Sequence, residues 1–281
     1  MEGELIIRKV YVDSRFRSEG SNGDFTIDLK QNIETPPGTV AFLDDVTIPH
    51  TWYSVANNNR YLYIAERAGI LPPYVYTVRQ LDIPQKNYNI DTYKDALESA
   101  LNSNLPNNIS ATYSVAANTD EHTLTIVSPL FAAFHFLSDK EIEINDSAHF
   151  AINKASPQSG NNVIRNFDSN MGTNAASFTY STTYTTGWLD FLNVHDIYIH
   201  SSLCKLDSLG PNGQTGILAK CPVSQSYGNT IHERLQSEHD YTDVGLASIS
   251  QIKLSIRDAH SNLINLNNSS WSATIIFRIL N

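Results

Sequence analysis

The chain has 281 residues, of which 41% are hydrophobic and 10% aromatic, so it can bury a substantial core and a disordered protein is excluded. Its formal net charge of −10 repels phosphates, which argues against direct nucleic-acid binding unless basic groups gather in one segment. The 14 tyrosines and 11 phenylalanines, with only 17% charged residues, favour strands and an all-β fold.

The first 23 residues predict an N-terminal arm that leads to the first strand and ends in the turn-rich segment Gly20–Gly23. Two interpretations are open. The arm is a disordered tail, or it docks on a neighbouring subunit, because apolar side chains such as Leu5 and Val10 are poorly suited to water. The arm carries four cations that are candidates for this contact: Arg8, Lys9, Arg15 and Arg17.

Two strands follow the arm. Asp24–Lys30 alternates apolar and polar side chains, which is typical of a half-buried strand. Thr39–Ile48 has the β-branched and aromatic composition of a longer strand, and Pro49 ends it because proline has no amide hydrogen to donate. Trp52 and Tyr53 follow as candidate interface or rim aromatics, and core packing is the alternative for Trp52.

The spacing of the apolar residues then changes from that of a strand to that of a helix, which indicates a small module. Apolar side chains recur every three to four residues, which predicts an amphipathic helix over 92–103 with Asp91 as its N-cap. Strands are predicted on both sides of this helix. We therefore assign residues 67–140 to an α+β module inserted in a loop of the main domain, which comprises 24–66 and 141–281.

The remaining sequence contains a loop-rich segment and the clearest strand pattern of the chain. Residues 145–186 are rich in Asn, Ser and Thr, so long surface loops are expected there. Ile252, Leu254 and Ile256 alternate with polar side chains, and the alternation returns over Trp271–Ile279. The last two strands are therefore expected to line the core of a β-sandwich.

Familiar catalytic patterns are absent from the sequence. His232 and Glu233 are not followed by a second histidine at helical spacing, so the zinc-protease motif is missing. Asp44 and Asp45 are neighbours on a strand and point to opposite faces, so they cannot act together as general acid and base. We predict that the protein is not an enzyme and has no catalytic residue, metal or cofactor.

The cysteines and the hydropathy add two expectations. Cys204 and Cys221 lack the Cys-x-x-Cys spacing of zinc sites, and we interpret them as buried thiols, with a disulfide as the alternative. No window approaches the roughly 20 apolar residues that a membrane-spanning helix needs, and Met1–Lys9 has no apolar run of a signal peptide. We therefore expect no membrane span, and synthesis in the cytoplasm.

Both ends of the chain resemble a known family. The first part runs from Val12-Asp-Ser-Arg15 through the strand at 24–29 to Val46-Thr-Ile-Pro-His-Thr-Trp-Tyr53. The second part is the strand Ile252–Asp258 with the final strand Trp271–Phe277. Together these segments resemble the penton, or minor capsid, proteins of Polinton (Maverick) elements, adintoviruses and virophages.

The resemblance implies a fold, a function and partners. The fold would be a single jelly-roll β-sandwich of eight main strands, with the α+β module projecting outward. The protein would be made in the host cytoplasm and would assemble as a homopentamer at the icosahedral vertices of a virion capsid, beside a major capsid protein with two jelly rolls in tandem. In this role the arm cations would bridge to neighbouring capsomers.

Two alternatives stay open at this point. A jelly-roll attachment module would bind a host receptor or a glycan through polar loops such as Asn170–Trp188. An enzyme on a jelly-roll scaffold, such as a cupin, would need several histidines and a carboxylate that face one cavity.

Overall fold

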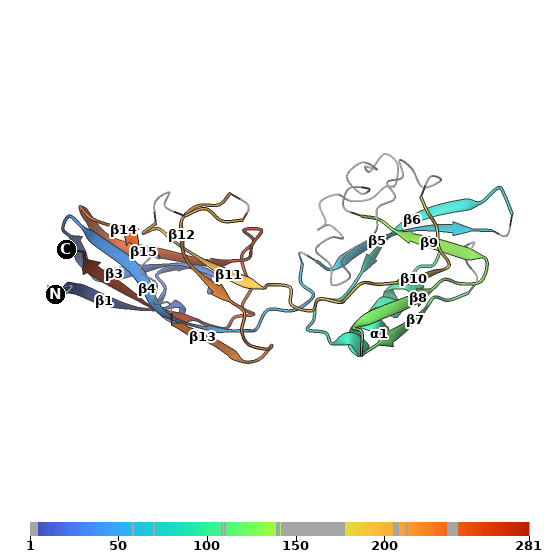
Figure 1. The fold of residues 1–281 in the computed structure, drawn as a ribbon, viewed down its shortest axis with the longest axis horizontal. Helices are drawn as coiled ribbons and strands as arrows, with labels where there is room; N and C mark the ends of the chain where they lie inside the picture. The colour runs from blue at the N-terminus through green and yellow to red at the C-terminus, as the bar shows by residue number, and fades with distance from the viewer. Residues whose placement is uncertain are drawn as a thin grey trace. The chain divides into compact units, whose positions relative to one another are not determined.

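The chain folds into two compact units, which Figure 1 shows as a ribbon. The jelly-roll unit comprises Met1–Trp52 and Val194–Asn281, and the inserted unit comprises Tyr53–Asn193. The computed structural model describes residues 5–57, 59–69, 71–107, 109, 111–138, 141, 178–204, 208–211, 213–234 and 241–280.

Two antiparallel sheets build the jelly-roll unit. The first sheet contains, in spatial order, β1 (Leu5–Asp13), β16 (Ser272–Ile279), β4 (Thr39–Pro49) and β13 (Thr230–Arg234), and β14 (Thr242–Asp243) also pairs with β4. The second contains β12 (Ile217–Pro222), β11 (Asp196–Ser201), β15 (Ala247–Arg257), β3 (Asp24–Thr35) and β2 (Glu19–Gly20).

The order of the strands identifies the fold. If the eight main strands are numbered along the chain, leaving out β2 and β14, the first sheet reads 1-8-3-6 and the second reads 5-4-7-2. Consecutive strands thus alternate between two sheets that enclose one core, except for the fourth and fifth, β11 and β12, which pair with each other; this is the arrangement of a jelly roll. The predicted all-β, single jelly-roll fold is confirmed.

The alternation of the last two strands places their apolar side chains between the sheets. Ile252, Leu254 and Ile256 of β15 and Ile275 and Phe277 of β16 are fully buried. These side chains belong to one apolar cluster. Both strands agree with the prediction from the sequence.

The predicted N-terminal arm is instead part of the first sheet. β1 pairs with β16 from Leu5 opposite Ile279 to Asp13 opposite Ser272, with a bulge between Ile6 and Arg8. Val12 is buried in the core cluster. The free-arm interpretation is therefore wrong for Leu5–Asp13, because these residues complete a sheet of their own chain.

The inserted unit combines two three-stranded sheets with one helix. One sheet has the order β6 (Val75–Asp82), β5 (Tyr61–Ala68) and β9 (Ala132–Phe136), and the other has the order β10 (Thr183–Thr185), β8 (Thr123–Val127) and β7 (Ser114–Asn118). The helix α1 spans Ile90–Asn102 and buries four side chains at helical spacing: Ile90, Tyr93, Leu97 and Leu101. These four side chains share an apolar cluster with strands of both sheets.

The start of α1 differs from the prediction. Asn89, not Asp91, is the N-cap: its side chain accepts a hydrogen bond from the Thr92 amide at 2.9 Å, and the Thr92 hydroxyl accepts one from the Asn89 amide at 3.0 Å. This reciprocal pair is a capping box. The helix therefore begins at Ile90, two residues before the predicted 92–103.

The division of the chain also differs from the predicted module 67–140 at both ends, because the inserted unit comprises Tyr53–Asn193. β5 pairs with β6 and β9, so residues 61–66, which the sequence assigns to the main domain, lie in the inserted unit. The apolar face of β5, with Leu62 and Ile64, packs in the cluster that also contains α1. The inserted unit leaves the jelly roll after β4 and returns before β11.

Only part of the predicted loop segment 145–186 can be assessed. Residues 145–177 lie outside the described residues. The remaining stretch is more than surface loop, because Thr183–Thr185 forms β10 and Phe178 and Thr186 are buried.

Candidate assembly surface

The predicted interface cations lie on or beside β1, an edge strand of the first sheet. Among the described residues no strand pairs with the opposite edge of β1, so that edge presents a row of backbone N–H and C=O groups. Val10 and Val12 pack inward, which directs Lys9 and Tyr11 outward. Tyr11 is 78% exposed. The edge therefore combines open backbone groups with an exposed aromatic ring.

A short 3-10 helix, η1 (Ser14–Phe16), follows β1 and holds a second aromatic ring in solvent. Asp13 caps it by accepting hydrogen bonds from the amide and the guanidinium of Arg15, and the guanidinium bond lowers the pKa of Asp13. Ser14 is buried, and its hydroxyl accepts a hydrogen bond from the Trp271 amide at 3.1 Å. This fixed turn leaves Phe16 77% exposed.

Three of the four predicted cations already have partners within the chain. Lys9 lies 3.6 Å from Asp44, and Arg15 lies 2.6 Å from Asp13. Arg17 donates to the Ser14 carbonyl and to the Asn22 side chain, each at 2.8 Å.

The fourth cation differs from these three. Arg8 is exposed and forms no ion pair among the described residues. The four cations thus lie on β1 and in the segment that follows it, and Arg8 is the one whose side chain has no partner among the described residues.

The structure separates the two predicted aromatics. Trp52 is 4% exposed and belongs to the jelly-roll core. Its ring stacks on His50 with 4.1 Å between the centroids, and His50 hydrogen-bonds the Gln225 carbonyl at 2.6 Å. Core packing, the alternative for Trp52, is therefore the correct interpretation. Tyr53 is half-buried and is the first residue of the inserted unit.

Sequence reasoning counted Tyr11 among the apolar residues of the arm but selected neither Tyr11 nor Phe16 as a candidate interface aromatic. The signal for Tyr11 was its position between Val10 and Val12, which have the opposite strand parity. Phe16 had no comparable signal, because its exposure depends on the turn that Asp13 and Ser14 hold.

Potential metal ligands are dispersed in the described part of the chain. No group of three or more His, Cys, Asp or Glu side chains is placed there to hold a metal ion. Cys221 is a buried free thiol, and burial raises its pKa to about 12, whereas Cys204 is half-buried. No helix among the described residues has the length and apolar character that crossing a bilayer requires.

Comparison with known proteins adds evidence on the fold. No protein-family model and no curated protein matches the chain. Among solved structures, the chain is similar to the mavirus penton protein, with 14% identity and a TM-score of 0.51 over 97% of this chain and 100% of that chain. It is also similar to a chain of the Sputnik virophage, with 12% identity and a TM-score of 0.42 over 96% of this chain and 97% of that chain. The protein therefore has the fold of the mavirus penton protein.

Proposed function

We propose that this protein is a structural protein of a viral capsid, and that it forms pentons at the icosahedral vertices. The main support is the likeness to the mavirus penton protein, which covers 97% of the chain and so includes both the jelly roll and the inserted unit. The resemblance at the two ends of the sequence points to the same family. The proposed role is assembly, with no chemical reaction.

Five copies would close a ring through a heterologous contact, in which one face of a subunit meets a different face of the next. We place one side of this contact on β1 and η1. An edge strand offers backbone hydrogen bonds, and exposed aromatic rings such as Tyr11 and Phe16 are the side chains that interface cores favour. Arg8 lies on the same strand and would contact either the next subunit or a major capsid protein with two jelly rolls.

The mass of the purified full chain, measured by light scattering over a range of concentration and salt, tests the pentamer. A mass near five times the 31.3 kDa of one chain is expected at high concentration. Three subunits would contradict the pentamer. A monomer under all conditions would leave co-assembly with the major capsid protein as the deciding test, with density at the fivefold vertices expected and empty vertices overturning the proposal.

Variants locate the contact. The double variant Tyr11→Ser with Phe16→Ser should raise the dissociation concentration by at least about 100-fold, because hot-spot aromatics contribute about 2 kcal/mol each. Leu246→Ser is the matched control, because Leu246 is 82% exposed but lies at the turn between β14 and β15. An equal effect of both changes would remove β1 and η1 from the interface.

A further inference from the structure

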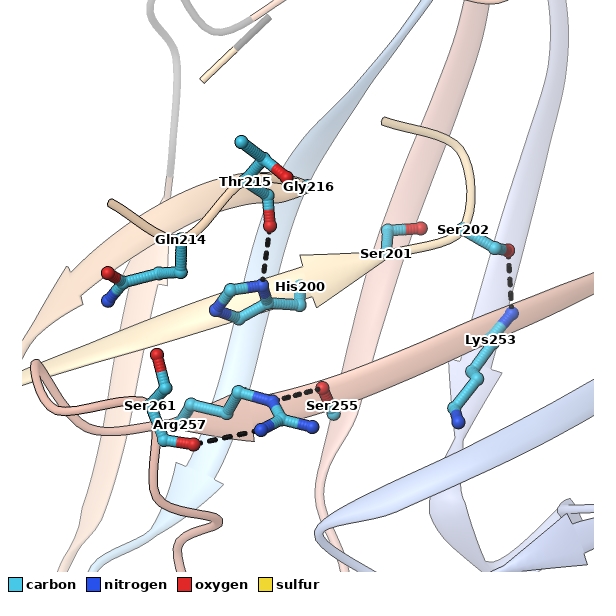
Figure 2. A pocket seen from close by; sticks show the side chains of 10 residues that line it. All are labelled: His200, Ser201, Ser202, Gln214, Thr215, Gly216, Lys253, Ser255, Arg257 and Ser261. Carbon is cyan, nitrogen blue, oxygen red and sulfur yellow. Dashed lines mark hydrogen bonds between the residues drawn. The ribbon is translucent and has the colours of Figure 1, made fainter. Parts of the chain in front are cut away.

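A cavity of about 380 Å³ lies over the outer face of the second sheet of the jelly-roll unit (Figure 2). Its walls come from β11, β15 and the turns beside them, and include His200, Gln214, Lys253, Ser255, Arg257 and Ser261. None of the described residues that line it carries a carboxylate. A cavity lined by two formal cations and no acid is unexpected in a chain with a net charge of −10.

Among the described residues, the hydrogen-bond partners of the Arg257 guanidinium are neutral. Its Nε donates to the Ser255 hydroxyl at 3.2 Å, and its Nη1 donates to the Ser261 carbonyl at 2.8 Å. These bonds fix the guanidinium at the cavity, as Figure 2 shows. Among the described residues no carboxylate lies within ion-pair distance of it. A half-buried cation without a counter-ion is costly, and an anion in the cavity would relieve that cost.

Two serine hydroxyls that line the same cavity can each donate a hydrogen bond to a ligand. Ser255 Oγ accepts from Arg257 Nε, and Ser202 Oγ accepts from the backbone amide of Lys253 at 3.0 Å. Because each oxygen is already used as an acceptor, its own hydrogen is available for a ligand. The protein thus supplies hydroxyl donors from β15 and from the turn after β11.

His200 adds a group whose role depends on its protonation. Its Nδ1 hydrogen-bonds the Thr215 carbonyl at 3.2 Å, which can only accept, so Nδ1 carries the hydrogen. Nε2 is buried and has no hydrogen-bond partner among the described residues. The neutral ring accepts a hydrogen bond from a ligand at Nε2, and the protonated ring donates one.

We propose that this cavity binds a compact tetrahedral oxyanion, a sulfate or phosphate group, either free or as the ester of a sugar. The guanidinium of Arg257 and the hydroxyl of Ser255 lie together, and His200 lies opposite Ser255 on β11. Donors placed on two strands suit oxygens arranged in three dimensions better than the two oxygens of a planar carboxylate. The volume lies within the ~300–1,000 Å³ of small-molecule sites, which leaves room for a sugar ring. This inference does not depend on the proposed capsid function.

Binding should strengthen as pH falls, because protonated His200 becomes a cationic donor. On β15, Arg257 and Lys253 flank Ser255, which lies opposite His200, and the Arg257 charge opposes protonation of the ring until an anion is present. The Lys253 charge is partly offset by Asp24 of β3 at 3.4 Å. On the other side, β12 and its preceding turn place only the neutral residues 215–219 near the ring. Burial lowers the pKa of His200 from its ordinary value of 6.5, so the gain in affinity comes below that pH.

Isothermal titration calorimetry on the full chain tests the proposal, with sodium sulfate, glucosamine 6-sulfate, glucosamine and sodium acetate as probes at constant ionic strength. Saturable binding of sulfate, absent for acetate, is expected. Tighter binding of the sulfated sugar than of sulfate assigns the ester as the preferred form, and equal binding assigns the free ion. Absence of saturable binding by both sulfate probes, or equal binding of acetate, overturns the proposal.

Three variants locate the binding. Arg257→Gln should weaken sulfate at least about tenfold, since it removes a charged donor, and Ser255→Ala about threefold. Lys220→Gln is the control, because Lys220 lies on the same sheet but pairs with Asp196 at 3.0 Å and does not line the cavity. Unchanged affinity in folded Arg257→Gln excludes this cavity. If that variant does not fold, unchanged affinity in Ser255→Ala excludes it instead.

Discussion

The jelly-roll unit and the inserted unit stabilise their cores in different ways. Between the two sheets of the jelly roll lies one apolar cluster that runs from Val12 on β1 to Phe277 on β16. The inserted unit buries a carboxylate beside its apolar cluster: Glu66 is 1% exposed. Arg79 binds this carboxylate through two nitrogens at 2.7 and 2.8 Å, and the Tyr113 hydroxyl donates to it at 2.7 Å.

The buried ion pair has a structural purpose that an apolar pair would not serve. The same Arg79 guanidinium donates to the carbonyls of Leu101 and Ser103 at the end of α1, at 2.8 and 2.7 Å. It therefore fixes the helix to the β5–β6 hairpin and satisfies carbonyls that a helix end leaves open. Close packing of apolar side chains stabilises the jelly-roll core. In the inserted unit, hydrogen bonds from Arg79 orient the helix.

The largest expected effect is the loss of Trp271. This side chain is buried, packs edge-to-face on Phe25 with 5.5 Å between centroids, and donates to the Asn22 carbonyl at 2.7 Å. Trp271→Ala should lower the free energy of unfolding by about 3–5 kcal/mol, through the lost contacts and the cavity. Hydrogen exchange measured by mass spectrometry should show lower protection in the jelly-roll unit.

Trp188→Ala is the control for Trp271→Ala. Trp188 lies in the inserted unit and is 62% exposed, so its loss should change stability by less than about 0.5 kcal/mol. A comparable loss in the two variants would contradict the assignment of Trp271 to the core.

The next effect separates buried from exposed ion pairs in the inserted unit. Glu66→Gln removes the charge that pairs with Arg79 and should cost about 3 kcal/mol. Asp82→Asn is the matched control, since Asp82 and Arg60 form a similar two-bond pair at 2.7 Å on the same hairpin but half of the Asp82 side chain is exposed. That change should cost less than about 1 kcal/mol. Denaturant unfolding measures both, and equal costs would mean that burial of the pair is not decisive.

A smaller effect is expected at the start of α1. Asn89→Ala removes the N-cap and should cost about 1 kcal/mol, with faster exchange confined to the first turn of the helix. Asp91→Ala should cost less, because its side chain is exposed and not the cap. The reverse order of the two variants would restore Asp91 as the cap.

Acid should also distinguish the units. Burial lowers the pKa of His50 in the jelly roll below 6.5, so its contribution to stability is present above pH 6.5 and is lost as pH falls through the folded-state pKa. In the inserted unit, burial raises the pKa of Glu141, but hydrogen bonds from His135 and Ser138 outweigh it and lower the pKa below 4.5. That contribution is present above pH 4.5 and is lost only at lower pH.

Hydrogen exchange across this pH range should therefore show the jelly-roll unit losing protection first. His50→Gln should remove the loss that begins near pH 6.5, and Glu141→Gln should remove the one that begins near pH 4.5. Simultaneous loss in both units, unaffected by either variant, would contradict the assignment.

Local alternation explains which parts of the fold could be predicted. β15 and β16 were predictable because Ile252 and Ile275 belong to runs of sequence in which every second side chain is apolar. β1 was not, because a bulge between Ile6 and Arg8 interrupts its alternation and because two cations, Arg8 and Lys9, stand within its apolar stretch. A strand with such a pattern looks like an arm until its partner, β16, is known.

The candidate sites were less accessible to sequence reasoning because they depend on pairing between distant segments. Trp52 carries no local sign of its stacking on His50 or of the core that surrounds both. The cavity at Arg257 forms because β11 pairs with β15, which brings His200 opposite Ser255. Both environments depend on which distant segments lie side by side in the fold, and a local sequence pattern does not specify that.

The pairing of β1 with β16 has a consequence for folding during synthesis. All contacts within the inserted unit lie in the continuous segment Tyr53–Asn193, so this unit can fold while the chain is still being made. The first sheet cannot, because its bond between Trp271 and Ser14 joins residues 257 positions apart. Pairings of such long range form slowly, so β1 must stay unpaired on the ribosome until the last strands emerge. During that time the backbone groups of β1 are available to other chains, and we expect nascent subunits to associate through this strand.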